Sequence, residues 1–244
     1  NLLDETPMHC RQLKLPHPIL GNDDMRRLRT CERADFKVAT LSAVFDATAE
    51  DPGETLGQAL DELVDAAEAA IGKGASLLII SDRAASPESA PIPSLLATAA
   101  LHHGLLQRRL RNEAGIVVES GEPREVMHFC LLCGYGANGV NPYLAFEAIG
   151  QLWADGLLPQ DMQADQFCDR YVTAIKKGIL KTMSKMGIST LRSYHSAQQF
   201  EAVGLDREVV QKYFTGTASR IEGMDLDALA WEALQRHSAG YATP

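Results

Sequence analysis

Short apolar runs alternate with helical segments through the middle of this chain, and this alternation restricts the fold more than any other feature. The runs are FKVATLSAVF, ASLLIISD, AGIVVES and ANGVNPY. ASLLIISD and AGIVVES are continuously apolar, which is typical of strands that are buried on both faces. Strand and helix repeated in this order predict a parallel α/β sheet. We expect strands near 37–44, 76–81, 115–119 and 138–141.

Helical patterns fill the intervals between these runs. Residues 53–74 carry leucines at helical spacing and end at Gly72 and Gly74, and further helices are expected over about 93–112 and within EPREVMHFCLLCGYG. About four (β/α) units are too few to close a barrel of eight. The expected fold is therefore an open parallel sheet or a half-barrel.

The pattern becomes helical after Pro142. We expect helices near 143–155, 163–186, 189–203, 206–213 and 224–236, with no strand between them. The chain then divides into a linker with a short helix over 1–35, an α/β core over 36–150 and a helical extension over 151–244.

Composition excludes several classes of protein. The chain has 23 Lys+Arg against 32 Asp+Glu, and this net charge of -9 argues against a nucleic-acid-binding surface. It contains no run of about 18 apolar residues, so no membrane span is expected. An odd number of cysteines without a signal pattern favours the cytoplasm. The first residues, Asn1-Leu2-Leu3-Asp4, suggest an internal piece of a longer polypeptide.

Polar residues follow each predicted strand. They are Asp46, Asp82, Arg83, Glu119 and Asn141. Ligands of parallel α/β folds gather at the carboxyl ends of strands, so these residues are a candidate polar site with carboxylates for acid–base chemistry. In the alternative interpretation, Asp82 and Glu122 cap helices and Arg83 pairs with one of them. These residue types do not name a reaction by themselves.

Two pairs of residues have the chemistry of metal ligands but not the spacing. Cys130 and Cys133 form a Cys-x-x-Cys pair in an apolar helical segment, without the further ligands that zinc requires. His102 and His103 point about 100° apart on a helix and cannot share a metal. We expect packing and surface roles, and no metal site.

Lysines recur along one predicted helix in a chain that is acidic overall. Lys177, Lys181 and Lys185 fall within about 80° of arc, opposite Ile175, Ile179, Met183 and Met186. The apolar side is expected to pack on the core and the lysine side is not. Gly187 should end the helix in a left-handed conformation, and Ser189 or Thr190 should cap the next one.

Seven segments resemble the large subunit of glutamate synthase, in the order in which that family has them. They are PHPIL, LSAVFDAT, GASLLIISDR, PIPSLLATAALHHGLLQRRLR, VVESGEPREVMHFCLLCGYGANGVNPYLAFE, KGILKTMSKMGISTLRSYHSAQQFEAVGL and YFTGTASRIEGMDLDALA. Together they cover nearly the whole chain. The resemblance is to the central region of the family, between the amidotransferase domain and the FMN-binding barrel.

The resemblance implies a role within a larger enzyme. That enzyme converts glutamine and 2-oxoglutarate into two glutamates, with ammonia passing through an internal tunnel to a site that uses FMN and an iron–sulfur cluster. Its partners would be the amidotransferase and FMN domains of the same polypeptide, with a reductase small subunit or ferredoxin, and the electron donor stays open. The family's N-terminal nucleophilic cysteine is missing here, since residue 1 is Asn. This segment is therefore expected to be non-catalytic and to hold no cofactor.

Two alternatives stay open. The chain could be a free-standing α/β enzyme that uses the strand-end carboxylates, or a helical scaffold. The resemblance also suggests a use for the lysines, which would form a basic edge facing the flavin domain.

Overall fold

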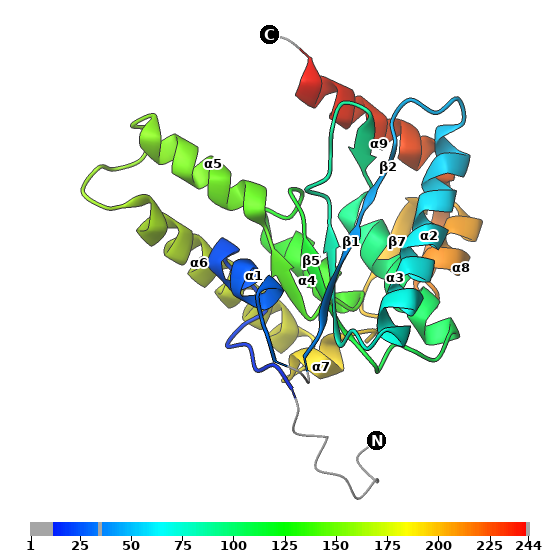
Figure 1. Cartoon of the computed structure of the whole chain (residues 1–244), viewed down its shortest axis with the longest axis horizontal. Helices are drawn as coiled ribbons and strands as arrows, with labels where there is room; N and C mark the ends of the chain where they lie inside the picture. The colour runs from blue at the N-terminus through cyan, green and yellow to red at the C-terminus, as the bar shows by residue number, and fades with distance from the viewer. Residues whose placement is uncertain (1–11, 34–35, 243–244) are drawn as a thin grey trace, which may run out of the picture.

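The computed structural model describes residues 12–33 and 36–242, and a four-stranded parallel sheet lies at its centre (Figure 1). The strands are β1 (Val38–Ser42), β3 (Leu77–Ser81), β5 (Gly115–Glu119) and β6 (Gly139–Asn141), in the order β1-β3-β5-β6. Leu77 lies opposite Val38 on one side and Gly115 on the other. The predicted open parallel sheet is confirmed, because all three neighbouring pairs run in the same direction.

Three helices cover one face of the sheet. They are α2 (Pro52–Gly72), α3 (Ser94–Gln107) and α4 (Val126–Gly134), and they share a core with Leu78, Ile80, Ile116 and Val118. The start of α2 is set by Asp51, whose carboxylate accepts a hydrogen bond from the Glu54 N–H at 3.0 Å. Successive side chains of a strand point to opposite faces, so the remaining apolar residues need a second cover.

The N-terminal segment supplies that second cover. Helix α1 (Asn22–Arg29) confirms the short predicted helix, and its Met25 and Leu28 pack with Leu77, Ile79 and Val117. Just before it, Ile19 forms a parallel bridge to Val140 of β6. Residues 19–29 therefore build part of the core, although the sequence suggested a linker.

The strand predicted near 37–44 divides into two. After β1 the chain continues as β2 (Val44–Asp46), which pairs antiparallel with β4 (Ser89–Pro91). β4 lies outside the four segments in which strands were expected. This pair extends beyond the carboxyl edge of the sheet (Figure 1).

The expectation of a wholly helical part after residue 143 is wrong in two places. The helices are α5 (Tyr143–Ala154), α6 (Ala164–Lys185), α7 (Leu191–Tyr194), α8 (Arg207–Tyr213) and α9 (Leu226–Tyr241). Between them, β7 (Glu201–Leu205) and β8 (Ala218–Met224) pair in parallel. The helix predicted over 189–203 ends at Tyr194 because Ser196 and Gln198 have positive φ values of 57° and 54°, which a helix cannot contain.

The last helix returns to the core. Ala230 and Ala233 of α9 are buried, and α9 packs along α2. The two helices come so close that a Cβ built on Gly53 would lie 1.6 Å from Asp227 Oδ1. The part after residue 151 is thus continuous with the α/β core through α9.

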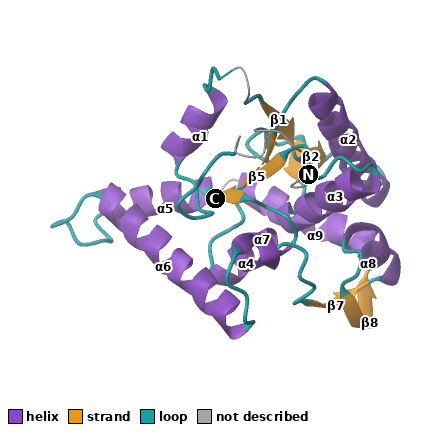
Figure 2. Ribbon diagram, turned by 90° about the horizontal axis from the view of Figure 1, so that it is seen from below, coloured by secondary structure: helices purple, strands orange, loops and turns teal. Residues whose placement is uncertain are grey.

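Helices α5 and α6 form a hairpin that projects from the sheet (Figures 1 and 2). α6 is attached to the body through the buried Ile175, Ile179 and Met183, whereas α5 buries none of its residues. Gly178 allows α6 to approach α4, since a Cβ there would lie 2.4 Å from Val126 Cγ2. Over the described residues, no helix is both long and apolar enough to cross a membrane.

Candidate functional site

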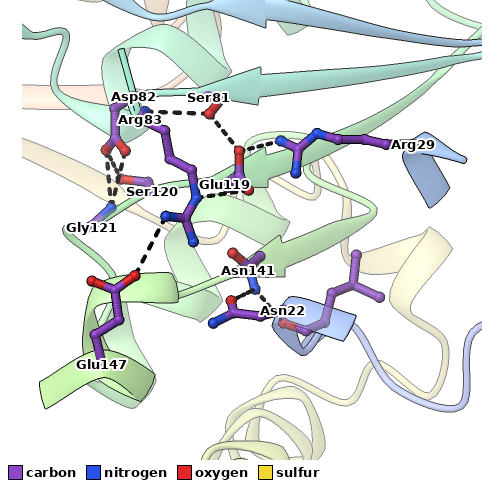
Figure 3. Close-up of polar contacts among 11 residues, drawn as sticks. Asn22, Arg29, Ser81, Asp82, Arg83, Glu119, Ser120, Gly121, Asn141 and Glu147 are labelled. Carbon is purple, nitrogen blue, oxygen red and sulfur yellow. Dashed lines mark hydrogen bonds and ion pairs between the residues drawn. The ribbon is translucent and has the colours of Figure 1, made fainter. Parts of the chain in front are cut away.

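Four of the five predicted strand-end residues meet at the carboxyl edge of the sheet (Figure 3). We call Asp82, Arg83, Glu119 and Asn141 the strand-end cluster. Asp82 and Arg83 follow β3, Glu119 is the last residue of β5, and Asn141 is the last residue of β6. Neighbouring parallel strands end at the same edge, which brings residues far apart in the sequence into one group.

Glu119 is the anion of this cluster. Its side chain is 1% exposed and accepts hydrogen bonds from Arg29 Nη2 at 2.5 Å, Ser81 Oγ at 2.5 Å and Arg83 Nε at 3.1 Å. Burial disfavours ionisation, but the hydrogen bonds from Arg29 and Ser81 and the charges of both arginines outweigh it, so the pKa of Glu119 lies below its ordinary value. Glu119 is held ionised and is not a general acid.

Asp82 has the opposite electrostatic character. Its carboxylate is buried and accepts hydrogen bonds from Ser120 Oγ at 2.6 Å and Gly121 N at 3.0 Å, and the Tyr143 hydroxyl also hydrogen-bonds to it. Burial raises the pKa of Asp82 in spite of these donors. It holds the turn after β5 against the start of α5.

Arg83 joins the cluster to α5. Besides Glu119, its guanidinium approaches Glu147 Oε1 at 3.4 Å and lies 3.9 Å from the centre of the Tyr143 ring. The capping interpretation is confirmed for Glu122, whose Oε2 accepts a hydrogen bond from the Ser94 N–H at the start of α3. It is wrong for Arg83, which pairs with Glu119 and Glu147 rather than with Asp82 or Glu122.

Asn141 faces the N-terminal segment. Its Nδ2 donates to Leu20 O at 2.8 Å and to Asn22 Oδ1 at 3.0 Å, while its buried Oδ1 has no partner in the part of the chain that is described. The amide thus connects β6 to α1.

Asp46 is not brought to the cluster. It lies in β2 opposite Ser89 and is exposed, and its Oδ1 accepts hydrogen bonds from the N–H and the hydroxyl of Thr48 at 2.8 and 2.7 Å. These bonds lower the pKa of Asp46 and make it a local turn residue.

Two partners of Glu119 were missed from the sequence. Ser81 is the last residue of β3, so the rule that found Glu119 could have found it. Arg29 lies 90 positions from Glu119 and gave no local signal.

Ion pairs and hydrogen bonds between residues of the chain hold the strand-end cluster together. Arg26, Arg29, Arg83 and Glu119 line a cavity of about 280 Å³ together with Asn22, Met25 and Thr30. Both buried carboxylates are engaged by donors of the chain itself, so neither is placed to exchange a proton with a bound substrate. The cluster fixes α1, β3, β5 and α5 relative to one another.

Cys130 and Cys133 lie in the core on α4. Burial, with a smaller contribution from Cys130, raises the pKa of Cys133 to about 12, which disfavours the thiolate that metals bind. No group of three or more His, Cys, Asp and Glu side chains within residues 12–33 and 36–242 is arranged to hold a metal ion.

His102 belongs to a separate buried network. Its Nδ1 accepts a hydrogen bond from Arg111 Nε at 2.9 Å, and its Nε2 lies 2.7 Å from Ser196 Oγ. Because Nδ1 is an acceptor, the neutral ring carries its proton on Nε2 and donates it to Ser196. His102 is therefore not a base for that hydroxyl, and the network anchors the segment after α7.

The three lysines of α6 lie on its exposed side. Lys177, Lys181 and Lys185 are all exposed, opposite the buried Ile175, Ile179 and Met183. Gly187 has a φ of 71°, and the Thr190 hydroxyl accepts a hydrogen bond from the Ser193 N–H, so the predicted stop and cap are confirmed.

Comparisons with known proteins identify a family. A family model described as the glutamate synthase central domain matches residues 1–206. The chain is 42% identical over 241 residues to the glutamate synthase large chain (NADPH) of Bacillus subtilis, which covers 99% of this chain and 15% of that protein. It is 40% identical over 245 residues to the glutamate synthase (NADH) of Schizosaccharomyces pombe, with coverages of 100% and 12%.

A ferredoxin-dependent relative matches over a similar length. The ferredoxin-dependent glutamate synthase of Pyropia yezoensis is 36% identical over 257 residues, covering 99% of this chain and 16% of that protein. The chain thus spans less than a fifth of the length of each of these relatives. Because the family model matches most of the residues, the chain belongs to the glutamate synthase central domain family.

Proposed function

We propose that this chain is the central, non-catalytic domain of a cytoplasmic glutamate synthase large chain. The whole enzyme would convert glutamine, 2-oxoglutarate and reducing equivalents into two glutamates. The central domain would join the glutaminase and FMN domains and help to wall the path of ammonia between them. The observation that carries the proposal is the match over 99–100% of this chain to only 12–16% of three glutamate synthases.

The site geometry supports a structural role for this segment. Glu119 and Asp82 are both engaged by donors of the chain and hold secondary structure together. Cys130 and Cys133 are buried in the core, and no third potential ligand is grouped with them among the described residues, whereas an iron–sulfur cluster is held by about four. In this proposal the FMN and the cluster belong to other parts of the polypeptide.

The electron donor is the finer part of the proposal. The relatives are named for NADPH, NADH and ferredoxin, so the family contains all three donors. The partner is accordingly a reductase small subunit or ferredoxin, and an assay of the whole enzyme with each electron donor separates these possibilities.

The lysines of α6 are the proposed contact with the flavin domain. α6 lies on the projecting hairpin (Figure 2). Lys177, Lys181 and Lys185 are all exposed and form the basic edge of this helix. Residues three or four apart on a helix are neighbours, so these like charges repel by roughly 0.2–0.5 kcal/mol per pair. An acidic or anionic surface of the neighbouring domain would relieve that repulsion.

A nitrogen balance of the full-length enzyme, which compares the ammonia released with the glutamate formed, tests both the assignment to glutamate synthase and the proposed role of the lysines. The variants are Lys181→Glu with Lys185→Glu, and the control Lys73→Glu, an exposed lysine after α2. We expect the charge-reversed enzyme to hydrolyse amide-labelled glutamine normally, but to release more labelled ammonia per glutamate formed and to retain less flavin. The control should resemble the wild type.

Two outcomes decide different parts of the proposal. If the charge-reversed enzyme releases no more ammonia per glutamate than the wild type and retains flavin normally, the basic edge is only a solvated face. If neither the wild-type full-length protein nor its variants make glutamate from glutamine and 2-oxoglutarate, the assignment to glutamate synthase fails.

A further inference from the structure

A second, larger cavity opens beside the strand-end cluster. Its volume is about 890 Å³, and Asp82 and Gly121, which follow β3 and β5 at their carboxyl ends, are among its lining residues. Side chains of α3, α4, α5 and α9 supply the other walls. This volume lies within the roughly 300–1,000 Å³ of small-molecule sites, and the position is the one at which parallel α/β sheets bind ligands.

The walls of the cavity are largely apolar. Leu95 of α3, Leu131 and Leu132 of α4 and Ala233 of α9 line it, and Leu144 of α5 stands at its edge with half of its surface exposed. Apolar walls of this kind bury the body of a ligand and contribute most of the affinity.

The two carboxylates of the cavity are already engaged. Asp82 accepts hydrogen bonds from Ser120, Gly121 and Tyr143, and Glu122 Oε2 accepts the Ser94 N–H at 2.7 Å. Burial also raises the pKa of Asp82 above its ordinary value. These acids therefore organise the wall and are not set up to bind a cation.

Arg124 and His128 in the lining can donate hydrogen bonds to a ligand. The Arg124 side chain lies exposed at the rim and makes no ion pair among the described residues. His128 Nδ1 accepts the backbone N–H groups of Arg124 and Glu125 at 3.1 and 3.3 Å, so the neutral ring carries its proton on Nε2. Arg236, also in the lining, pairs with the exposed Glu232 at 2.9 Å.

We propose that this cavity binds a small organic anion, with an apolar body against the leucines and a carboxylate or sulfonate at Arg124. A cavity with apolar walls and an uncommitted guanidinium at its mouth is complementary to such a ligand, since a charge-assisted hydrogen bond orients the anion and the leucines bury the rest. The proposal is independent of the role of the chain in glutamate synthase.

The probe is 1-anilinonaphthalene-8-sulfonate, an aromatic anion whose fluorescence rises on transfer to an apolar site. Two glycines provide a matched pair of blocking and control variants. Gly240 lines the cavity on α9 and Gly150 lies on α5 outside it, and a Cβ at either would meet nothing within 4 Å. Gly240→Trp should fill the mouth of the cavity, whereas Gly150→Trp adds the same side chain elsewhere.

We expect saturable binding of one probe per chain, unchanged in Gly150→Trp and weakened at least about tenfold in Gly240→Trp. Arg124→Ala should raise Kd roughly tenfold, whereas Arg170→Ala on exposed α6 should not. The uncharged analogue N-phenyl-1-naphthylamine should bind equally well to Arg124→Ala and to the wild type.

Three results would overturn the proposal. The first is equal probe binding by the two tryptophan variants, which would place the probe elsewhere. The second is insensitivity of sulfonate binding to Arg124→Ala, which would leave an apolar groove without anion recognition. The third is non-saturable binding by the wild type while its thermal unfolding is cooperative.

Discussion

Replacing Glu119 with Gln removes the anion on which Arg29, Arg83 and Ser81 converge. Breaking a fully buried ion pair costs about 3–5 kcal/mol. The side chains of Arg29 and Arg83 are 36% and 40% exposed, so water can solvate part of what they lose. We therefore expect Glu119→Gln to lower the free energy of unfolding by about 2–3 kcal/mol at pH 7.

The control makes the same substitution at a second partner of Arg83. The Glu147 side chain is 52% exposed and lies 3.4 Å from the guanidinium, so Glu147→Gln should cost no more than about 1 kcal/mol. Urea unfolding followed by circular dichroism measures both variants. Similar costs for the two would refute the argument that burial makes Glu119 important.

The same pair gives a dependence on pH. The pKa of Glu119 in the folded chain lies below its ordinary value of 4.5, so the folded state favours the ionised form. Its contribution is fully present above the unfolded pKa and is lost as pH falls through the lower, folded pKa. The difference between wild type and Glu119→Gln should therefore be constant near neutral pH and shrink below about pH 4.5. A difference that grows on acidification would contradict this.

Three further predictions concern other parts of the fold. Gly178→Ala should destabilise the chain by about 1–3 kcal/mol, because its methyl group would meet α4, whereas Gly150→Ala should be neutral or slightly stabilising in the same melting experiment. Iodoacetamide at pH 8 should alkylate the half-buried Cys31 but not the buried Cys133 until the chain is unfolded, as read by mass spectrometry. The pKa of Asp82 is raised in the folded chain, so its contribution to the free energy of unfolding is largest in acid and falls as pH rises. Asp82→Asn should therefore cost less stability at pH 7 than at pH 4. A larger cost at pH 7 than at pH 4 in urea unfolding would refute this assignment.

The parallel sheet was predictable because its central strands, β3 and β5, are buried on both faces. All five residues of β3 are buried, and a continuous apolar run of this length between helical segments is typical of a central parallel strand. Strand order then placed Asp82, Glu119 and Asn141 at one edge. The hydrogen bonds and ion pairs of these residues could not be predicted beyond that placement.

The errors have physical causes that the sequence does not display locally. β8 is exposed along almost its whole length, so it lacks the alternation that marks a half-buried strand. Arg29 reaches Glu119 only because α1 covers the second face of the sheet, and this packing depends on contacts distant in the sequence. Gly53 and Gly178 each permit the close approach of another helix, and helical periodicity within one segment does not reveal such a contact.

The central claim is that this domain contributes architecture and no catalytic group. The direct test assays the 244-residue chain for glutamine hydrolysis and for glutamate formation from glutamine and 2-oxoglutarate, with FMN and a reductant supplied, beside the full-length polypeptide at equal concentration. The account predicts a cooperatively unfolding chain without turnover and a full-length enzyme that carries out both reactions. Ammonia or glutamate produced above the blank by the 244-residue chain would contradict it.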